Sequence, residues 1–287
     1  MSDCVFTANP AGASLKPERM EILKNEKHVA FRAALEAGGL IKERMGQIAS
    51  IDYKSAFNLV TDVDKASEKL ILDIIKTEYP GDAILAEESG ASKTGQKRRW
   101  LIDPLDGTTN YAHSYPFFCV SIGLEEDGEI VLGVIYDPVK DEMFYATKGG
   151  GAFLNDERIK VSSVDKLANS LLVTGFPPDT RGTELNNMVE FTTLTNMSHG
   201  VRRDGSAALD LSYVAAGRLD GFWEKKLAAW DVGAGSLIVE EAGGKVTDLD
   251  GNKLDVDKGW ILATNGLIHD EVLKVYSDLQ LSKAPTG

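Results

Sequence analysis

The chain has 287 residues, which is enough for one large domain with a substantial hydrophobic core or for two closely packed halves. Its net charge of −13 argues against a surface built to bind nucleic acid or an anionic membrane. No apolar run is long enough to span a bilayer and no secretory signal is visible. Cys4 and Cys119 are unsuited to a disulfide, so we expect a cytoplasmic protein.

The N-terminal part of the sequence combines an irregular segment with a long helical pattern. Residues 1–17 contain several Pro, Gly and Ser and lack periodicity, so we expect a loosely ordered arm there. From about 18 to 48, alanine, leucine and isoleucine recur on one helical face. Gly38 and Gly39 fall inside that pattern and weigh against a single continuous helix.

The rest of the chain alternates between expected strands and helices. Residues 54–58 are expected to form a loop, and Thr61 to cap a second helix with Asp62 and Asp64 in its first turn. Strands or strand-rich segments are predicted at 83–86, 100–103, 117–154, 170–174, 199–203, 219–224 and 260–263. Helices are predicted from Thr108 onwards and at 184–197, 205–216, 230–243 and 267–278.

One acidic turn stands out, in the segment 100–113, which reads W-L-I-D-P-L-D-G-T-T-N-Y-A-H. Pro104 biases Asp103 towards an extended conformation, so we expect the strand to end at Asp103. Asp106 follows three residues later, and Gly107 permits a tight turn into the next helix. Two carboxylates beside a helix N-terminus can hold a divalent cation and a phosphate together, although this motif alone is more typical of a solvated turn.

Further acids have the same two interpretations. Glu87 and Glu88 follow an apolar strand and could be a solvated strand end, and Asp231 could simply cap a helix. If these acids meet Asp103 and Asp106 in one cleft, their repulsion and desolvation cost several kcal/mol unless cations compensate. Carboxylates favour a hard cation such as Mg²⁺, whereas the scattered histidines and unpartnered cysteines disfavour zinc.

Three separated segments agree, in content and order, with one known signature. Residues 86–89 (A-E-E-S), the segment 100–113 and residues 230–235 (W-D-V-G-A-G) together resemble the inositol monophosphatase family. The resemblance extends from about residue 26 to about residue 279. It implies an α/β (α+β) fold, a layered αβαβα sandwich of the inositol monophosphatase and fructose-1,6-bisphosphatase type.

The resemblance also implies an activity for a single phosphatase domain, 18–287, made of two closely packed halves at about 18–160 and 161–287. The expected reaction is hydrolysis of a small phosphomonoester, myo-inositol monophosphate in the first place, by water activated in a site of two or three Mg²⁺ ions. Lithium sensitivity and a homodimer are further implications, and neither nucleic acid nor membrane is expected as a direct partner.

Roles for individual residues come with the resemblance. The implied metal ligands are Glu87, Asp103, Leu105 through its carbonyl, Asp106, Asp231 and, for a third ion through water, Asp64. The implied substrate-binding residues are Leu105, Asp106, Gly107, Thr108, Gly205, Ser206, Ala207, Glu224 and Asp231. Glu87 and the Thr108 hydroxyl would orient the attacking water, with Asp106 as a further catalytic residue, and the N–H groups of Gly107 and Thr108 would bind phosphate oxygens.

Several alternatives stay open. Glu224 could be an exposed strand end instead of a contact to sugar hydroxyls, and Lys54 could be an exposed loop lysine instead of a residue near the third ion. The same chemistry could act on fructose 1,6-bisphosphate, histidinol phosphate, 3′-phosphoadenosine 5′-phosphate or NADP(H). A different hypothesis is a non-catalytic role as an accessory protein of a transcription complex.

Overall fold

The computed structural model describes residues 17–55, 58–92, 96–177, 180, 182–183 and 185–283. The arm expected at 1–17 therefore lies outside the described residues, except for Pro17, which begins the first helix. Within the described ranges, no helix is both long enough and apolar enough to cross a membrane.

The strands form two large sheets and one hairpin. An eight-stranded sheet has the order β10-β9-β8-β7-β6-β5-β3-β4, and a five-stranded sheet has the order β12-β11-β13-β15-β14. The first sheet contains β3 (Ala83–Ala86), β4 (Gly90–Ser92), β5 (Arg98–Asp106), β6 (Cys119–Glu126), β7 (Glu129–Asp137), β8 (Glu142–Thr147), β9 (Gly151–Leu154) and β10 (Glu157–Arg158). The second contains β11 (Leu171–Thr174), β12 (Gly200–Arg202), β13 (Gly221–Glu224), β14 (Lys245–Thr247) and β15 (Ile261–Thr264).

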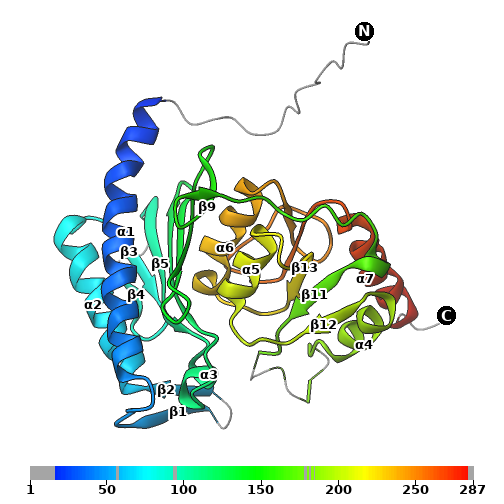
Figure 1. Cartoon of the computed structure of the whole chain (residues 1–287), viewed down its shortest axis with the longest axis horizontal. Helices are drawn as coiled ribbons and strands as arrows, with labels where there is room; N and C mark the ends of the chain where they lie inside the picture. The colour runs from blue at the N-terminus through cyan, green and yellow to red at the C-terminus, as the bar shows by residue number, and fades with distance from the viewer. Residues whose placement is uncertain are drawn as a thin grey trace.

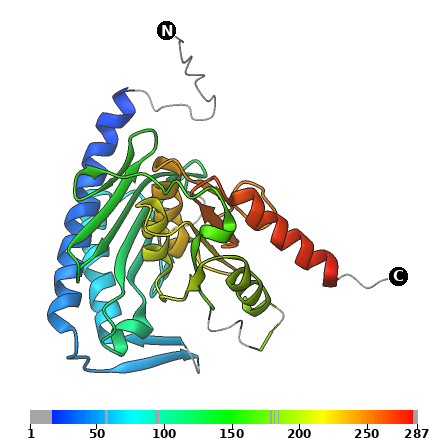
Figure 2. The same ribbon diagram turned by 45° about the vertical axis from the view of Figure 1, so that its right-hand side comes forward.

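Helices separate and cover these sheets. Apart from the short α3 (Thr108–Ala112), the α-helices are α1 (Pro17–Arg44), α2 (Asp62–Glu78), α4 (Met188–Met197), α5 (Ala207–Ala215), α6 (Ala229–Glu241) and α7 (His269–Lys283). Helices α1 and α2 pack on the first sheet, α5 and α6 lie between the two sheets, and α4 and α7 pack on the second (Figures 1 and 2). The predicted layered αβαβα sandwich is thus confirmed.

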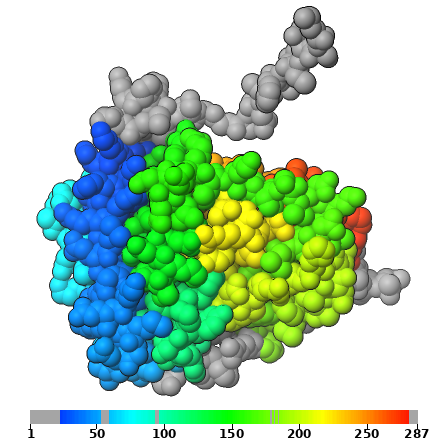
Figure 3. Space-filling model, viewed as in Figure 1, coloured from blue at the N-terminus to red at the C-terminus, as the bar shows by residue number. Residues whose placement is uncertain are grey.

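Three hydrophobic clusters fill the spaces between these five layers. One joins α1 and α2 to the first sheet, a second surrounds α5 and α6, and a third lies between the second sheet and α7. The space-filling view shows the N-terminal layers, blue to green, meeting the yellow α5 segment along a continuous surface (Figure 3). The acidic segments therefore lie on layers that are packed firmly against each other.

Helix α1 runs without interruption through Gly38 and Gly39, so the doubt raised by this glycine pair was wrong. A Cβ atom built on Gly38 would lie 2.6 Å from the ring of Tyr136 in β7. Buried alanines, among them Ala30, Ala34 and Ala37, continue the same small-residue face. The glycine is there because the helix approaches the sheet closely, and the packing gained offsets its poor helix propensity.

Two local expectations need correction. Residues 54 and 55 belong to strand β1 (Ile51–Ser55) and residue 58 to strand β2 (Asn58–Thr61), so the predicted loop is an antiparallel hairpin, with 56–57 outside the described residues. Strand β5 does not end at Asp103 but continues through Pro104 to Asp106, with an irregular register between the two acids. A bulge accommodates proline, which has no N–H to donate to a neighbouring strand.

Candidate active site

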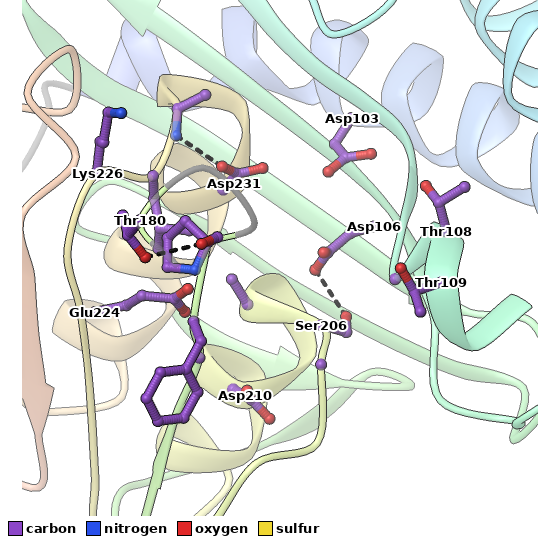
Figure 4. A pocket seen from close by; sticks show the side chains of 18 of the residues that line it. Asp103, Asp106, Thr108, Thr109, Thr180, Ser206, Asp210, Glu224, Lys226 and Asp231 are labelled. Carbon is purple, nitrogen blue, oxygen red and sulfur yellow. Dashed lines mark hydrogen bonds between the residues drawn. The ribbon is translucent and has the colours of Figure 1, made fainter. Parts of the chain in front are cut away.

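A cavity of about 1280 Å³ opens where the end of β5 meets the starts of α5 and α6 (Figure 4). Of the residues singled out from the sequence, it is lined by Glu87, Asp103, Leu105, Asp106, Gly107, Thr108, Gly205, Ser206, Ala207, Glu224 and Asp231. Asp64 is buried outside this lining, and the side chain of Lys54 lies outside the described residues. The structure thus brings the three separated motifs to one place.

The irregular register of β5 explains why two acids three residues apart reach the same cavity. In a regular strand, Asp103 and Asp106 would point to opposite faces of the sheet. The Asp103 Oδ1 atom accepts a hydrogen bond from the Leu105 N–H at 3.0 Å, which closes the turn between them. Asp106 Oδ2 accepts hydrogen bonds from the Ser206 hydroxyl and the Ala208 N–H, both at 2.7 Å. The bulge therefore turns a strand end into a two-carboxylate site.

Glu87 and Asp231 reach the cavity from two other elements. Strand β3 runs parallel to β5, and the Glu87 N–H donates to the Ile102 carbonyl at 3.1 Å, which places Glu87 beside Asp103. Asp231 is the third residue of α6, and its Oδ2 atom accepts from the Ala228 N–H at 2.7 Å. Ala228, not Asp231, is the residue that caps α6. Gly233 keeps that helix close to the first sheet, because a Cβ there would lie 2.6 Å from Leu101.

These carboxylates repel one another in an environment with little water. Burial raises the pKa of Asp103 well above its usual range, and Glu87, Asp106 and Asp231 raise it further. Burial also raises the pKa of Asp231, with Asp106 and Glu87 adding to the effect, and it raises the pKa of Asp106 to about 6. Asp103 itself is only 2% exposed. In the described part of the chain, no lysine or arginine pairs with Asp103, Asp106 or Asp231.

The donor set suits a hard divalent cation. Asp103, Asp106 and Asp231 each have one carboxylate oxygen that accepts a hydrogen bond from a backbone N–H. Oxygen ligands of this kind are those that Mg²⁺ prefers. Among the described residues, however, no three His, Cys, Asp or Glu side chains could hold a metal ion as they stand.

Thr108 stands at the start of the short helix α3. Gly107 precedes it with a φ of 96°, and a Cβ at Gly107 would lie 2.9 Å from the Phe117 carbonyl oxygen, so only glycine fits this turn. The first helical hydrogen bond runs from the Tyr111 N–H to the Gly107 carbonyl, which leaves the preceding N–H groups without a helical acceptor. The Thr108 hydroxyl lies 2.9 Å from Asp64 Oδ1.

Asp64 forms hydrogen bonds that hold Thr108 in place. Its carboxylate accepts hydrogen bonds from the Thr61 N–H, at 2.9 Å, and from the hydroxyls of Thr61 and Thr108. Thr61 caps α2 as predicted, with Asp64 completing a capping box. Asp64 thus connects the start of α2 to Thr108, and its suggested contact to a third ion through water stays a prediction.

Some residues of the cavity carried no signal in the sequence. Phe176, Thr180, Asn186 and Lys226 contribute to its wall, and so does Asp210 in the first turn of α5. Glu224, for which an exposed strand end was an alternative, is only 5% exposed. A cavity lined by buried acids, beside helix N–H groups that have no helical acceptor, is typical of enzymes that cleave phosphate esters with the help of metal ions.

Comparison with known proteins agrees with this class. The sequence profile of the Inositol monophosphatase family matches residues 23–281. The inositol-1-monophosphatase of Synechocystis sp. is 50% identical over 248 residues, covering 85% of this chain and 86% of that protein. Nus factor SuhB of Pseudomonas aeruginosa is 44% identical, covering 83% of this chain and 90% of that protein.

A solved structure extends the likeness to the fold. The inositol monophosphatase of Anabaena (Nostoc) sp. superimposes with a TM-score of 0.82 at 49% identity, covering 89% of this chain and 96% of that one. The chain belongs to the inositol monophosphatase family, a family of metal-dependent phosphoric monoester hydrolases. Its substrate is accordingly a phosphorylated compound.

Proposed function

We propose that this chain hydrolyses inositol monophosphate and similar small polyol phosphates in a Mg²⁺-dependent reaction. One observation carries the proposal: Asp103, Asp106 and Asp231 line one cavity, and among the described residues no lysine or arginine forms an ion pair with any of them. Carboxylates gathered in one buried site repel one another unless protons or cations compensate. The names of the relatives from Synechocystis and Anabaena support inositol monophosphate as the substrate.

The residues divide the work between binding the ion and binding the phosphate. Glu87, Asp103, the Leu105 carbonyl, Asp106 and Asp231 would hold two Mg²⁺ ions, and Glu87 with Asp64 would contribute to a third. Bound cations would neutralise this cluster and lower the pKa of a coordinated water towards neutral. The N–H groups of Gly107 and Thr108 would bind phosphate oxygens.

Side chains near Thr108 would orient the attacking water and accept its proton. The Thr108 hydroxyl lies within reach of Asp64 and of the Leu105 carbonyl, so its hydrogen has acceptors in the protein and its lone pairs can accept a hydrogen bond from water. Glu87 would accept a proton from the same water. Ser206 and Ala208 hold Asp106 in place through its Oδ2 atom, and Glu224 would accept hydrogen bonds from sugar hydroxyls.

The proposal is tested by measuring phosphate release from a panel of esters with and without Mg²⁺. We expect release from inositol 1-phosphate to require Mg²⁺ and Asp106→Asn to lower kcat/KM by about 10² or more, since the variant loses an ionised ligand. Asp270→Asn, an exposed acid in α7, serves as the matched control. Equal activity without Mg²⁺, or higher kcat/KM on fructose 1,6-bisphosphate, histidinol phosphate, 3′-phosphoadenosine 5′-phosphate or NADP(H), would contradict the proposal.

Inhibition by lithium, assembly into a homodimer and a cytoplasmic location complete the proposal. A second function is favoured by one comparison, since relatives carry the name Nus factor SuhB. The chain would then also act as an accessory protein in a transcription complex. Rescue of a deletion strain by Asp106→Asn separates the two functions, because only a non-catalytic role survives the loss of activity.

A further inference from the structure

Asp210 lies one helical turn beyond the acidic cluster, on the wall of the same cavity. It follows Ser206 by four residues, and its N–H donates to the Ser206 carbonyl at 3.0 Å. Residues four apart share a helix face, so Asp210 continues the face from which the Ser206 hydroxyl contacts Asp106. Figure 4 shows Asp210 and Glu224 on the side of the cavity away from Thr108. Asp210 therefore faces the region where the leaving alcohol of an ester bound at Thr108 would lie.

Asp210 carries a buried carboxylate oxygen that no described residue bonds. The side chain is 1% exposed, and its Oδ1 atom is buried without a partner among the described residues. Leaving a buried acceptor unpaired destabilises the folded state. The acids Asp204, Asp106 and Glu224 add unfavourable charge, and only Arg203 acts in the opposite direction. Among the described residues, Arg203 is thus the one named source of compensation for burying this group, and no hydrogen-bond donor reaches Oδ1.

Glu224 presents a second acceptor of the same kind. It is buried at the end of β13, and no hydrogen bond to its carboxylate is formed by the described residues. A Cβ on Gly175 would lie 2.1 Å from Glu224 Oε2, so the glycine makes room for the carboxylate. Two unpaired acceptors at one end of a cavity are complementary to a ligand rich in hydroxyl donors.

A purely structural role explains Asp210 less well. An acid in the first turn of a helix is stabilised by the helix dipole. That benefit is available to an exposed side chain, as for Asp270 at the start of α7. Burial without a donor costs more than the dipole returns.

We propose that Asp210 is a specificity-determining residue, which accepts a hydrogen bond from a hydroxyl of the leaving group. The cavity then selects phosphate esters of polyhydroxylated alcohols over esters whose alcohol carries no further hydroxyl. The inference rests on the proposed phosphatase function, since it names the part of the substrate that this residue reads.

The test compares two esters across three variants. For wild type, Asp210→Ala, Asp210→Asn and the control Asp270→Ala, kcat and KM are measured with inositol 1-phosphate and with phenyl phosphate. Asp210→Ala is expected to lower kcat/KM for the inositol ester about tenfold, mainly through KM, because the contact is remote from the phosphate. Phenyl phosphate should change less than twofold, and Asp210→Asn, which keeps an acceptor oxygen, should fall between wild type and Asp210→Ala.

Each outcome decides between the proposals. If wild type hydrolyses both esters and Asp210→Ala changes them equally, or changes neither, the inference about Asp210 is wrong and the phosphatase function stands. If wild type hydrolyses neither ester with Mg²⁺, both are wrong. Circular dichroism and Tm show whether Asp210→Ala folds. If Asp210→Ala does not fold, the test rests on Asp210→Asn. In that variant, kcat/KM for inositol 1-phosphate divided by kcat/KM for phenyl phosphate must be lower than in wild type.

Discussion

At the scale of single residues, two adjacent glycines in α1 have opposite environments. A Cβ on Gly38 would lie 2.6 Å from the Tyr136 ring and 3.3 Å from Pro138, whereas a Cβ on Gly39 would meet nothing within 4 Å. Gly38 is buried and Gly39 is exposed. The two glycines are neighbours in one helix. Substitution of Gly39 therefore tests the effect of backbone entropy alone, whereas substitution of Gly38 adds a steric clash.

We expect substitutions at these positions to change stability in opposite directions. Gly39→Ala should raise the free energy of unfolding by about 0.5–1 kcal/mol, because alanine loses less backbone entropy in a helix. Gly38→Ala should lower it by about 1–3 kcal/mol, because the methyl group displaces a packed ring. Urea denaturation of both variants measures the two changes. A destabilised Gly39→Ala, or an unchanged Gly38→Ala, would contradict this account.

The acids of the candidate site differ in how far the sequence predicts them. Asp103, Asp106 and Asp231 sit in motifs where proline, glycine and neighbouring acids give each residue a recognisable context. Asp210 has no such context, because an acid in the first turn of a helix is common and is usually solvated. Its burial depends on packing between α5 and distant strands, which local sequence does not encode.

At the scale of elements, the strand and helix order was predictable, and the errors came from long-range pairing. The hydrophobic alternation expected of a strand is absent at 54–58, yet Ile51 pairs with Thr61 and Tyr53 with Leu59 in a hairpin. Backbone hydrogen bonds formed this hairpin despite a weak side-chain pattern. Likewise, β5 runs past Pro104 because β6 pairs with Asp106 through Cys119. Neither partner is visible from the segment itself.

The start of α7 contains a buried histidine that links three elements. His269 lies between Thr247 of β14 and Thr264 of β15, with both hydroxyls 3.0 Å from its ring nitrogens. Burial, followed by the charge of Lys245, lowers the pKa of His269 to about 4. The folded protein therefore binds fewer protons at this ring than the unfolded chain does.

Acid should accordingly weaken the fold through His269. Its stabilising contribution is complete above the unfolded pKa of about 6.5 and is lost as the pH falls towards 4. Between pH 7.5 and pH 5 the loss should be about 2 kcal/mol. Because other groups also titrate in this range, the loss is measured by urea denaturation as a difference: wild type and His199→Gln, an exposed control, should each lose about 2 kcal/mol more between the two pH values than His269→Gln does. His269→Gln should be less stable at pH 7.5 but show a smaller dependence on pH; the same slope in all three proteins would exclude His269 as the cause.

At the scale of the whole molecule, the acidic cavity draws on several layers of the sandwich. Glu87, Asp103 and Asp106 belong to the first sheet and its connections, Asp231 to the helical layer between the sheets, and Glu224 to the second sheet. Their mutual repulsion therefore acts between layers. A cation bound among them would replace that repulsion by attraction, so ion binding should stabilise the entire fold and not only the site.

The size of this stabilisation should depend on pH in a defined direction. The pKa of Asp106 is about 6 in the folded protein against an ordinary 3.8, so without cations its folded-state advantage is complete below pH 3.8 and is lost as the pH rises through 6. Mg²⁺ competes with protons for the same oxygens and should therefore stabilise the fold more at pH 7.5 than at pH 5.

The expected shift in thermal stability is measurable. At a Mg²⁺ concentration of 100 times Kd, the free energy of unfolding rises by about 2.7 kcal/mol, or roughly 5 °C in Tm for a chain of this size. Thermal unfolding with MgCl₂, against NaCl at equal ionic strength, measures the shift. Asp106→Asn should reduce it, whereas an equal shift at both pH values would show that the ion binds elsewhere.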